Sequence, residues 1–514
     1  MALSRALTAA LAGVEAYPVV LETDLARQGM PSFTMVGLAE GAVRESKERV
    51  FAALKNRGFK LPPSRITVNL APANMRKEGS GYDLPLALGL LAAAEVIPAK
   101  SLDGYFFSGE LSLTGELKPV AGVLPLAIRA RQEGAKGLLV AAANAQEASV
   151  VKDLTVYPVE TLDQAVGLLS GGEQIPPAVF NEATFTPDLD PFPLDFSEVK
   201  GQEHAKRAIE IAAAGGHNLL FMGPPGSGKT MLAKRIPSVL PPLTFDEALE
   251  VTRVYSVAGE LEKKGGSLVT IRPFRSPHHT ISDAGLIGGG STPRPGEVSM
   301  AHRGVLFLDE LPEFKKNVLE VLRQPIEDGQ VTISRASMSL TYPAQFMLVA
   351  AMNPCPCGFR GDDRHDCTCT GVKVRHYLSK LSGPLLDRID LQVEVPAVPY
   401  KDLKVETGKI DSATMRARVL AARNIQTERY SRIKLRTNSQ LSGKALGTFC
   451  PITEDCHRFL ETANQRLGLS ARAHTRILRL ARTIADLDAQ ADIRVEHIAE
   501  AINYRNLDRQ GATG

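Results

Sequence analysis

The sequence predicts an α/β protein of several domains that ends in a helical region. Strand-like and helix-like segments alternate over residues 1–170 and again from Val199 to about Val395. From Tyr400 onward, helical periodicity dominates. At ~150 residues per domain, a chain of 514 residues suggests three or four domains.

The composition is that of a soluble globular chain. Apolar residues make up 44% and charged residues 23%, which excludes disorder and collagen-like repeats. The longest nearly uncharged apolar stretch, Leu84–Ala94, has eleven residues, well short of the roughly 20 that span a bilayer. Residues 1–13 lack a convincing small-residue cleavage site, so we expect a mature cytoplasmic protein.

Charge is distributed unevenly along the chain. The net charge of +3 says little, but the residues from Lys401 to Gly514 hold 20 Lys and Arg against 13 Asp and Glu, or +7. The other 400 residues therefore carry −4. A basic carboxyl-terminal region is compatible with nucleic-acid binding and equally with a solvated helical face.

Several elements of the first segment can be placed. Residues 65–70 and 105–108 have the composition of strands, and residues 42–56 have helical periodicity that stops near Gly58. Residues 171–196 contain Gly-Gly, Pro-Pro and further prolines, which is typical of an exposed linker.

A phosphate-binding loop follows the linker. Residues 218–222 form an apolar strand-like run, and residues 231–236 a helical segment. The eight residues before this helix fit GxxxxGK[ST]: Gly223, Pro224, Pro225, Gly226, Ser227, Gly228, Lys229 and Thr230. The glycines let backbone N–H groups turn toward phosphates, and the helix adds its positive end. We expect ATP here, with Lys229 at the β and γ phosphates and Thr230 on Mg²⁺.

Two later apolar runs end in polar residues. Residues 305–308 lead into Asp309, expected to hold Mg²⁺, and Glu310, expected to orient or deprotonate the attacking water. Residues 346–351 lead to Asn353, whose side chain is expected near the γ-phosphate or the water. For Asp309 and Glu310, the alternative is a buried strand that happens to end in charged residues. For Asn353, the alternative is a turn former before Pro354.

Arginines mark the region that follows. Arg388 stands in Leu-Leu-Asp-Arg-Ile-Asp, where it can be offered to a neighbouring subunit's γ-phosphate. Such an arginine finger contributes about 10³–10⁵ in rate. Arg472 begins a helix that holds Arg476, Arg479 and Arg482 at helical spacing. We expect one of these four to sense nucleotide and the others to meet polyanion, with solvent exposure as the alternative.

Taken together, these motifs resemble those of the AAA+ ATPases of the magnesium-chelatase-like branch, and within it the ComM/YifB family. By this resemblance Asn353 takes the sensor-1 role, Arg388 that of the arginine finger and Arg472 that of sensor 2. The resemblance implies a homo-hexameric, ATP- and Mg²⁺-dependent DNA helicase that drives branch migration during homologous recombination in natural transformation. A chelatase-type ATPase subunit, which remodels a protein partner for metal insertion, is the alternative.

Two further segments match this branch. Lys229 and Asp309 lie 80 residues apart, and the surplus is expected to form a helix-2 insert with Arg275, His278 and His279. Residues 330–342 alternate as a hairpin with Arg335 near the tip, similar to a pre-sensor-1 hairpin. We expect these four side chains to contact single-stranded and branched DNA, and ordinary loop charge is the alternative for Arg275 and Arg335.

The amino-terminal segment resembles the proteolytic domain of Lon, a Ser-Lys peptidase. The corresponding stretches are residues 79–85 and 120–126. Ser80 is out of register and no lysine follows the second stretch before Lys136, so the base that a serine nucleophile needs is missing. The segment also resembles the inactive module of the recombination protein RadA. A structural or DNA-binding role is therefore expected.

Four of the six cysteines crowd into fifteen residues: Cys355, Cys357, Cys367 and Cys369. In a cytosolic protein this CxC-x₉-CxC pattern suggests zinc, which prefers four thiolates in a tetrahedron. Reduced free thiols are the alternative, and Asp362, Asp363, His365 and Asp366 lie between as competing ligands. Cys450 and Cys456 are expected to be ordinary.

The predicted organisation has four parts. A Lon-like domain without a catalytic pair occupies residues 1–170 and is followed by the linker, 171–196. An AAA+ core with the insert, the hairpin and the cysteine cluster occupies residues 197–395. A helical, magnesium-chelatase-like lid occupies residues 396–514.

Overall fold

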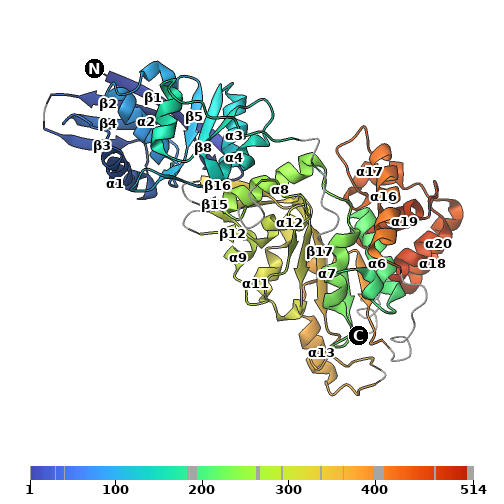
Figure 1. Cartoon of the computed structure of the whole chain (residues 1–514). Coiled ribbons are helices and arrows are strands. Elements are labelled where there is room, and N and C mark those ends of the chain that lie inside the picture. Colours follow the sequence, from blue (N-terminus) through green and yellow to red (C-terminus); the bar gives the residue numbers. More distant parts are fainter. Residues whose placement is uncertain are drawn as a thin grey trace.

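A computed structural model gives the fold of the chain. It describes residues 2–28, 30–39, 41–181, 185, 194–261, 267–290, 293–335, 338–362, 364–398, 410–467 and 470–505. Figure 1 shows three parts in a row: an amino-terminal unit in blue and cyan, a central unit in green and yellow, and carboxyl-terminal helices in orange and red. The α/β class predicted from the sequence is confirmed, since the first two units are each built on a mixed or parallel sheet covered by helices.

The amino-terminal unit is built on a seven-stranded sheet in the order β3-β4-β2-β1-β5-β8-β9. The long strands β1 and β2 pair antiparallel through a turn at Gly13, and β5, β8 and β9 are parallel to β1. The sheet strands are β1 (Ala2–Ala12), β2 (Glu15–Ala26), β3 (Ser32–Val36), β4 (Arg65–Ala71), β5 (Tyr105–Ser108), β8 (Gly137–Ala141) and β9 (Val156–Val159). A separate short hairpin joins β6 (Glu110–Leu111) to β7 (Leu117–Lys118).

Helix α2 (Asp83–Ala93) is the centre of this unit's core, because every one of its residues is buried. A helix that is apolar on all faces must be enclosed by other elements, and α2 packs on β1, β2 and α1. The other helices are α1 (Gly41–Asn56), α3 (Val123–Gln132), α4 (Ala142–Ser149) and α5 (Leu162–Leu169).

The central unit is built on a five-stranded parallel sheet in the order β11-β14-β17-β10-β18. Its inner strands are wholly apolar and buried, as strands covered on both faces must be. They are β10 (Leu219–Met222), β11 (Phe274–Arg275), β14 (Val305–Leu308), β17 (Met347–Met352) and β18 (Leu391–Glu394).

Helices and two small hairpins surround this sheet. The helices are α6 (Glu203–Gly215), α7 (Lys229–Val239), α8 (Phe245–Ala258), α9 (Asp283–Ile287), α10 (Glu297–Met300), α11 (Lys316–Glu320), α12 (Arg323–Asp328), α13 (Gly371–Leu378) and α14 (Gly383–Leu386). The hairpins are β12 (Gly288–Gly289) with β13 (Arg294–Pro295), and β15 (Gln330–Arg335) with β16 (Met338–Pro343). The second is the hairpin expected from the alternation over residues 330–342.

The sequence analysis placed Arg275 in an inserted loop, but Arg275 belongs to the sheet. Phe274 and Arg275 pair with Val305 and Leu306 as the edge strand of the sheet. The ring of Phe274 stacks on Phe307 with centroids 6.0 Å apart. A two-residue strand is too short to produce an alternating pattern, which is why sequence periodicity missed it.

The linker is not exposed throughout. Ala178 forms a bridge to Val156, and the rings of Phe180 and Phe185 lie 6.1 and 5.6 Å from that of Phe245 in α8. These apolar contacts hold part of the linker against the central unit, because burying aromatic surface outweighs the local preference of the surrounding Gly and Pro for exposed turns.

The carboxyl-terminal helices pack on α6 of the central unit. Figure 1 shows α16 and α19 beside α6, with α18 and α20 at the outer end. The helices are α16 (Ser412–Arg429), α17 (Gly443–Phe449), α18 (Glu454–Leu467), α19 (Ala471–Leu487) and α20 (Val495–Asn503). In the described part of the chain, no helix is long and apolar enough to cross a bilayer.

The arginines of α19 do not form the polyanion-binding or solvated face expected from their spacing. Arg476 and Arg482 are buried, and the Arg479 guanidinium donates to the carbonyl of Leu441. Arg482 pairs with Asp486 and donates to two backbone carbonyls. Only Arg472, with 73% of its side chain exposed, projects from this face. The helical spacing was right, but Arg476 pairs with Asp387 and Asp390 of the central unit, and Arg482 with Asp486 one turn further along α19.

Asp486 organises this cluster, which gives a stability prediction. Its buried carboxylate accepts from Arg429 at 2.8 Å, from Arg482 at 3.1 Å and from Asn438 at 2.8 Å. Asp486→Ala should cost about 3–5 kcal/mol, because it leaves two arginines without their counter-ion in the core. The exposed pair Asp455–Arg458 supplies the control, since Asp455→Ala should cost less than about 1 kcal/mol. Urea unfolding followed by circular dichroism compares them, and equal midpoints would contradict the prediction.

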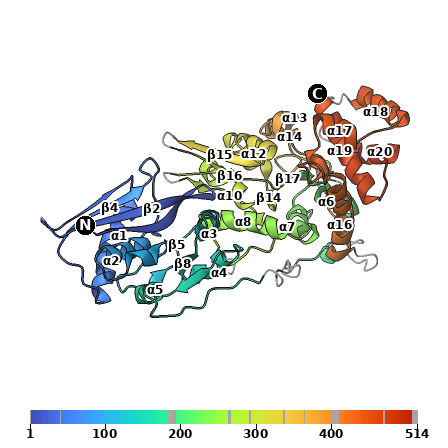
Figure 2. The same cartoon turned by 90° about the horizontal axis from the view of Figure 1, so that it is seen from above.

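The amino-terminal and central units are joined through α3 and α8, which lie side by side in Figure 2. The N–H of Gly122 donates to the carbonyl of Ser256 at 3.0 Å. The Ser256 hydroxyl donates to the buried carboxylate of Glu147, which also accepts from the N–H of Leu124 at 2.9 Å. Hydrogen bonds from two units to one buried carboxylate fix their contact.

Candidate functional site

Residues Gly223 to Gly228 connect the carboxyl end of β10 to α7, which begins at Lys229, in the strand–loop–helix order that the sequence predicted. Gly226 and Gly228 have φ values of +76° and +94°, a conformation that glycine adopts without strain. A Cβ on Gly223 would lie 2.1 Å from the carbonyl oxygen of Val395. These three glycines are therefore required by the backbone path, which turns N–H groups of the loop toward the start of α7.

Lys229 is the first residue of α7, and its ammonium lies inside the loop. Nζ donates to the carbonyls of Gly223 and Pro224, both at 2.8 Å, and to Oδ1 of Asn353 at 3.2 Å. Burial lowers the pKa of Lys229, while the nearby carboxylate of Asp309 opposes that shift. Asn353 follows β17, so two of the expected nucleotide-binding side chains meet directly.

Thr230 and Asp309 lie beside this lysine. The Thr230 hydroxyl donates to Oδ2 of Asp309 at 2.7 Å. A hydroxyl and a carboxylate that converge in this way supply the oxygen ligands that Mg²⁺ takes, together with phosphates and waters. These two residues therefore fit the magnesium site expected of them.

Glu310 stands next to Asp309 with a positive φ of +52°. Its N–H donates to Oδ1 of Asp309 at 2.9 Å, and 58% of its side chain is exposed. A non-glycine residue in this region is uncommon and carries local strain. The Glu310 side chain is thus accessible at the carboxyl end of β14.

His279, which was expected to contact DNA, lies at the nucleotide site. Its Nδ1 is 3.4 Å from Oε2 of Glu310, a contact that the sequence analysis did not predict. The rings of His278 and His279 lie 4.1 Å apart, and that of His279 also faces Phe314 at 6.4 Å. The segment after β11 thus touches the candidate base through His279, a contact that no local sequence pattern encodes.

Gln202 is a second residue that the sequence analysis missed. Its side-chain amide donates to the carbonyls of Ser227 at 3.4 Å and Pro396 at 2.6 Å. Gln202 has a φ of +60° and directly precedes α6. The Gly201-Gln202 pair before a helix was the only signal available, and it is too common to identify a site.

Arg388 and Arg472 lie at the opposite edge of the sheet from Lys229. The carbonyl of Arg388 accepts from the side chain of Asn218, which precedes β10, whereas the phosphate-binding loop follows β10. Arg472 pairs with Asp387 at 3.3 Å. The length of β10, four residues at about 3.3 Å each, separates both arginines from the loop of their own chain.

A cleft of about 630 Å³ occupies this opposite edge, between the central unit and the carboxyl-terminal helices. Asn218, Gly304 and Phe346, which each precede a strand, line it together with Arg388 and Arg476. The guanidinium of Arg388 bonds to Glu327 and to the carbonyl of Pro384, and among the described residues its buried Nε has no partner. The cleft is thus lined by guanidinium groups that are already paired with acids or carbonyls of the same chain.

The other expected DNA contacts have different positions. Arg275 forms a two-point ion pair with Glu297, with both N–O distances 2.6 Å, so a phosphate would have to compete with a carboxylate for it. This pair raises the pKa of Arg275. Arg335 ends β15 beside the hairpin tip, and its side chain lies outside the described residues.

The four clustered cysteines come together after Asn353. Cys355 is buried and the other three are partly buried, and their Sγ atoms all lie within 4.8 Å of one another. His365 instead pairs with Asp362 at 2.9 Å, and Asp363 lies outside the described residues. Cys450 and Cys456 are buried apart from this group, in the core formed with the carboxyl-terminal helices.

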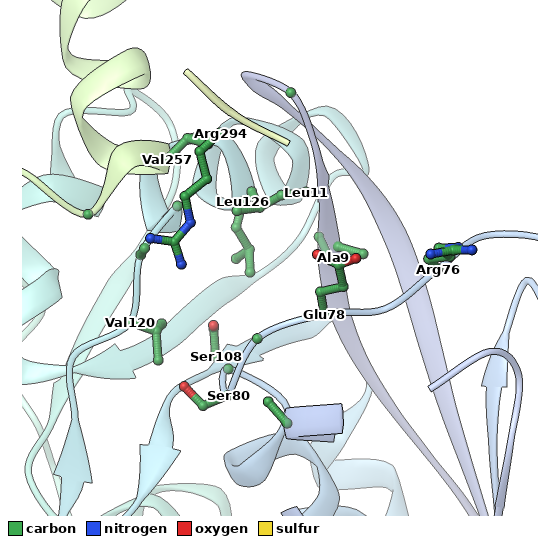
Figure 3. Close-up of a pocket in the computed structure, with 18 of the residues that line it drawn as sticks. Ala9, Leu11, Arg76, Glu78, Ser80, Ser108, Val120, Leu126, Val257 and Arg294 are labelled. Carbon is green, nitrogen blue, oxygen red and sulfur yellow. The ribbon is translucent and has the colours of Figure 1, made fainter. Parts of the chain in front are cut away.

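The stretches that resemble the Lon catalytic loops line a cavity of about 740 Å³ between the amino-terminal and central units. Figure 3 shows Ser80 and Ser108 on one side of it and Arg294, from β13, on the other. The nearby Lys77 is buried, and its ammonium donates to the carbonyls of Gly37 and Pro72. Lys136 donates to the carbonyl of Asp103. Both amines are thus engaged with backbone oxygens.

Comparison with known proteins places this geometry in a family. A family model described as "Magnesium chelatase, subunit ChlI" matches residues 195–403, and the models "Subunit ChlI of Mg-chelatase" and "Magnesium chelatase, subunit ChlI C-terminal" match residues 21–144 and 409–505. The magnesium-chelatase 38 kDa subunit of Rhodobacter capsulatus is 26% identical over 41% of this chain and 58% of its own length.

Other relatives match along nearly the whole chain, among them the following two. The competence protein ComM of Haemophilus influenzae is 46% identical over 99% of this chain and 98% of its own length. The Escherichia coli protein YifB is 44% identical over the same shares of the two chains. The chain therefore belongs to the ComM/YifB family of magnesium-chelatase-like AAA+ ATPases.

Proposed function

We propose that the chain is an ATP-hydrolysing motor that assembles into a homo-hexameric ring and moves branched DNA. The observation that carries the ring is the position of Arg388 and Arg472, one strand length away from Lys229. Neither arginine contacts the phosphate-binding loop of its own chain. An arginine finger can therefore act only if the cleft of one subunit, where the strands begin, faces the phosphate-binding loop of the next subunit.

The residues at and near the phosphate-binding loop each have a role in hydrolysis. Lys229 binds the β and γ phosphates of ATP, and Thr230 and Asp309 hold Mg²⁺, which neutralises charge on the phosphates when bound. Glu310 orients the attacking water or accepts its proton. Asn353, hydrogen-bonded to Lys229, contacts the γ-phosphate or the water. Arg388 of the adjoining subunit neutralises the charge that develops on the transferred group.

The DNA partner is supported by the hairpin and by the segment after β11. The hairpin places Arg335 next to its tip, where a basic side chain in a ring would face the pore. The ring of His278 packs at a tilt against that of His279, which contacts Glu310. Backbone phosphates bound near these histidines would therefore act directly on the position of Glu310. The relative from Haemophilus influenzae is called a competence protein, which fits branch migration during recombination in natural transformation.

Arg335→Ala should weaken binding of single-stranded DNA about equally for all sequences, because phosphate contacts carry no base information. The log–log dependence of affinity on salt should become shallower by about 0.7, the value for one lost phosphate contact. Stimulation of ATP hydrolysis by DNA should fall. Fluorescence anisotropy over a salt series checks this, with Arg458→Ala, on the exposed face of α18, as the control. An unchanged slope for Arg335→Ala would remove Arg335 from the DNA site.

The decisive assay is movement of a four-stranded DNA junction by the full-length protein with ATP and Mg²⁺. We expect junction movement and DNA-stimulated ATPase activity. The alternative is suggested by the similarity to a magnesium-chelatase subunit: an ATPase that remodels a partner for metal insertion. Such a protein would hydrolyse ATP independently of DNA. No junction movement together with no stimulation by any DNA would favour that alternative.

The amino-terminal unit, residues 1–170, is proposed as a Lon-like fold without a catalytic serine–lysine pair. The amines of Lys77 and Lys136 bond to carbonyl oxygens rather than to Ser80, which supports a structural or DNA-binding role. The linker then spans residues 171–196, the AAA+ core 197–395 and the helical lid 396–514. A cytoplasmic location follows from a role on chromosomal and incoming DNA.

A further inference from the structure

The sulfur atoms of Cys355, Cys357, Cys367 and Cys369 have the separations of a metal tetrathiolate. The Sγ–Sγ distances are 3.3 Å between Cys355 and Cys357, 3.7 Å between Cys355 and Cys367, and 3.6 Å between Cys357 and Cys367. A tetrahedron with Zn–S bonds of about 2.3 Å has sulfur–sulfur edges of about 3.8 Å. A disulfide needs sulfurs about 2.0 Å apart. The cluster therefore has the dimensions of a zinc site rather than those of a pair of disulfides.

Backbone geometry supports the same ligand set. The N–H of Cys357 donates to Sγ of Cys369 at 3.4 Å, and the N–H of Gly358 donates to the carbonyl of Cys355 at 3.0 Å. Amide hydrogen bonds to sulfur stabilise thiolates that bind a metal. His365 is occupied by Asp362 and by the ring of Phe359, 4.8 Å away. The four sulfurs are left as the ligands.

The loop that carries the cysteines has almost no apolar core. Between Asn353 and Thr370 the structure describes no helix or strand, and only Cys355 and Gly358 are buried among the described residues there. A segment this long without secondary structure cannot be held by hydrophobic burial and needs another cross-link. A metal on four thiolates supplies one, because binding free energy becomes folding free energy.

This loop lies directly on the nucleotide site. It begins at Asn353, which accepts a hydrogen bond from Lys229 at 3.2 Å. A Cβ on Gly358 would lie 2.6 Å from Cδ of Pro225 in the phosphate-binding loop and 3.8 Å from Cγ of Asn353. The cysteine loop thus packs closely on both residues. Its conformation fixes the distance between Asn353 and the phosphate-binding loop.

We infer that the four cysteines bind one Zn²⁺. The ion holds the cysteine loop against Pro225 and thereby keeps the hydrogen bond from Lys229 to Asn353 in place. Loss of the ion would release the loop, and with it the alignment of the nucleotide site. The coupling to nucleotide rests on the ATP site proposed above, whereas the metal site stands without it.

The metal site is tested on the full-length chain purified without added metal. Elemental analysis should find about one zinc per chain in the wild type. It should find almost none in the double variant that carries Cys367→Ser and Cys369→Ser. Cys456→Ala, which removes a buried thiol outside the cluster, should keep its zinc. After chelation, Co²⁺ should produce the visible absorption of a tetrahedral thiolate complex. A stoichiometry near zero, with four thiols titrating freely in the folded protein, would overturn the site.

The coupling is tested by nucleotide binding rather than by turnover. A fluorescent ATP analogue should bind the zinc-stripped protein at least ~10-fold more weakly, and Zn²⁺ should restore binding. If the stripped protein binds nucleotide as tightly as the loaded one, the coupling is wrong and the metal site remains. If the zinc-loaded protein binds no nucleotide at all, the proposed ATP site fails instead.

Two glycine variants test the packing with the cysteines intact. Gly358→Ala should retain zinc and weaken nucleotide binding, because the new methyl group meets Pro225. Gly361→Ala is the matched control, since Gly361 has a similar φ of +78° against +88° but nothing within 4 Å of its Cβ position. Both changes add the same kind of backbone strain. Equal nucleotide affinities in the two variants would overturn the coupling.

Discussion

Glu310→Gln should lower kcat for ATP hydrolysis by about 10²–10⁴-fold while leaving ATP and Mg²⁺ binding intact. Glutamine keeps the size and hydrogen-bonding capacity of the side chain but cannot accept a proton. Asp309 and Thr230, which hold each other at 2.7 Å, are untouched by the change. Single-turnover hydrolysis, measured beside equilibrium binding of a fluorescent ATP analogue, separates the two effects.

Lys229→Ala is the contrasting variant. It removes the ammonium that bonds to Gly223, Pro224 and Asn353, so nucleotide binding itself should weaken. If Glu310→Gln hydrolysed ATP at the wild-type rate, the base would be another residue. If both variants bound nucleotide equally poorly, Glu310 would have a structural role at the loop rather than a role in hydrolysis.

The nucleotide-binding edge was predictable because its signals are local. The phosphate-binding loop is one contiguous segment, and only glycine suits its backbone, as a φ of +94° at Gly228 and the close approach of Val395 to Gly223 illustrate. Asp309 and Asn353 each directly follow a buried apolar strand. Parallel strands bring their carboxyl ends to one edge, so the sequence pattern was enough to predict that these side chains gather.

Contacts between distant segments were not predictable in this way. His279 reaches Glu310 because β11 pairs with β14, yet β11 has only two residues and produces no alternating pattern. Arg476 of α19 is buried beside Asp390, which precedes β18 of the central unit. Periodicity predicts which residues share a helix face. It does not predict what packs on that face.

The cysteine cluster was predictable from the sequence only in part. The spacing of Cys355, Cys357, Cys367 and Cys369 predicted that four thiols gather, and their sulfurs do lie within 4.8 Å of one another. The spacing carried no information about Gly358 and Pro225, whose close packing links the cysteine loop to the phosphate-binding loop. That link depends on the positions of β10 and β17 as neighbours in the sheet.

Arg388 should act in the active site of a neighbouring subunit, and its loss should have a large effect. Arg388→Ala is expected to reduce kcat by about 10³–10⁵-fold, the range for an arginine finger, without abolishing nucleotide binding. Its guanidinium is held by Glu327 and Pro384 at the cleft edge, one strand length away from the Lys229 of the same chain. Removing it therefore leaves its own phosphate-binding loop unchanged.

Mixing two inactive variants distinguishes action across an interface from action within one chain. Rings that contain both Arg388→Ala and Lys229→Ala subunits should recover some ATPase activity, because part of the interfaces then combine an intact loop with an intact arginine. The recovered activity should follow the mixing ratio, with a maximum at intermediate proportions. Size-exclusion chromatography with light scattering first establishes that each variant still assembles. If both assemble and no ratio restores activity, Arg388 does not complete the site of its neighbour, and the shared-site ring would have to be abandoned.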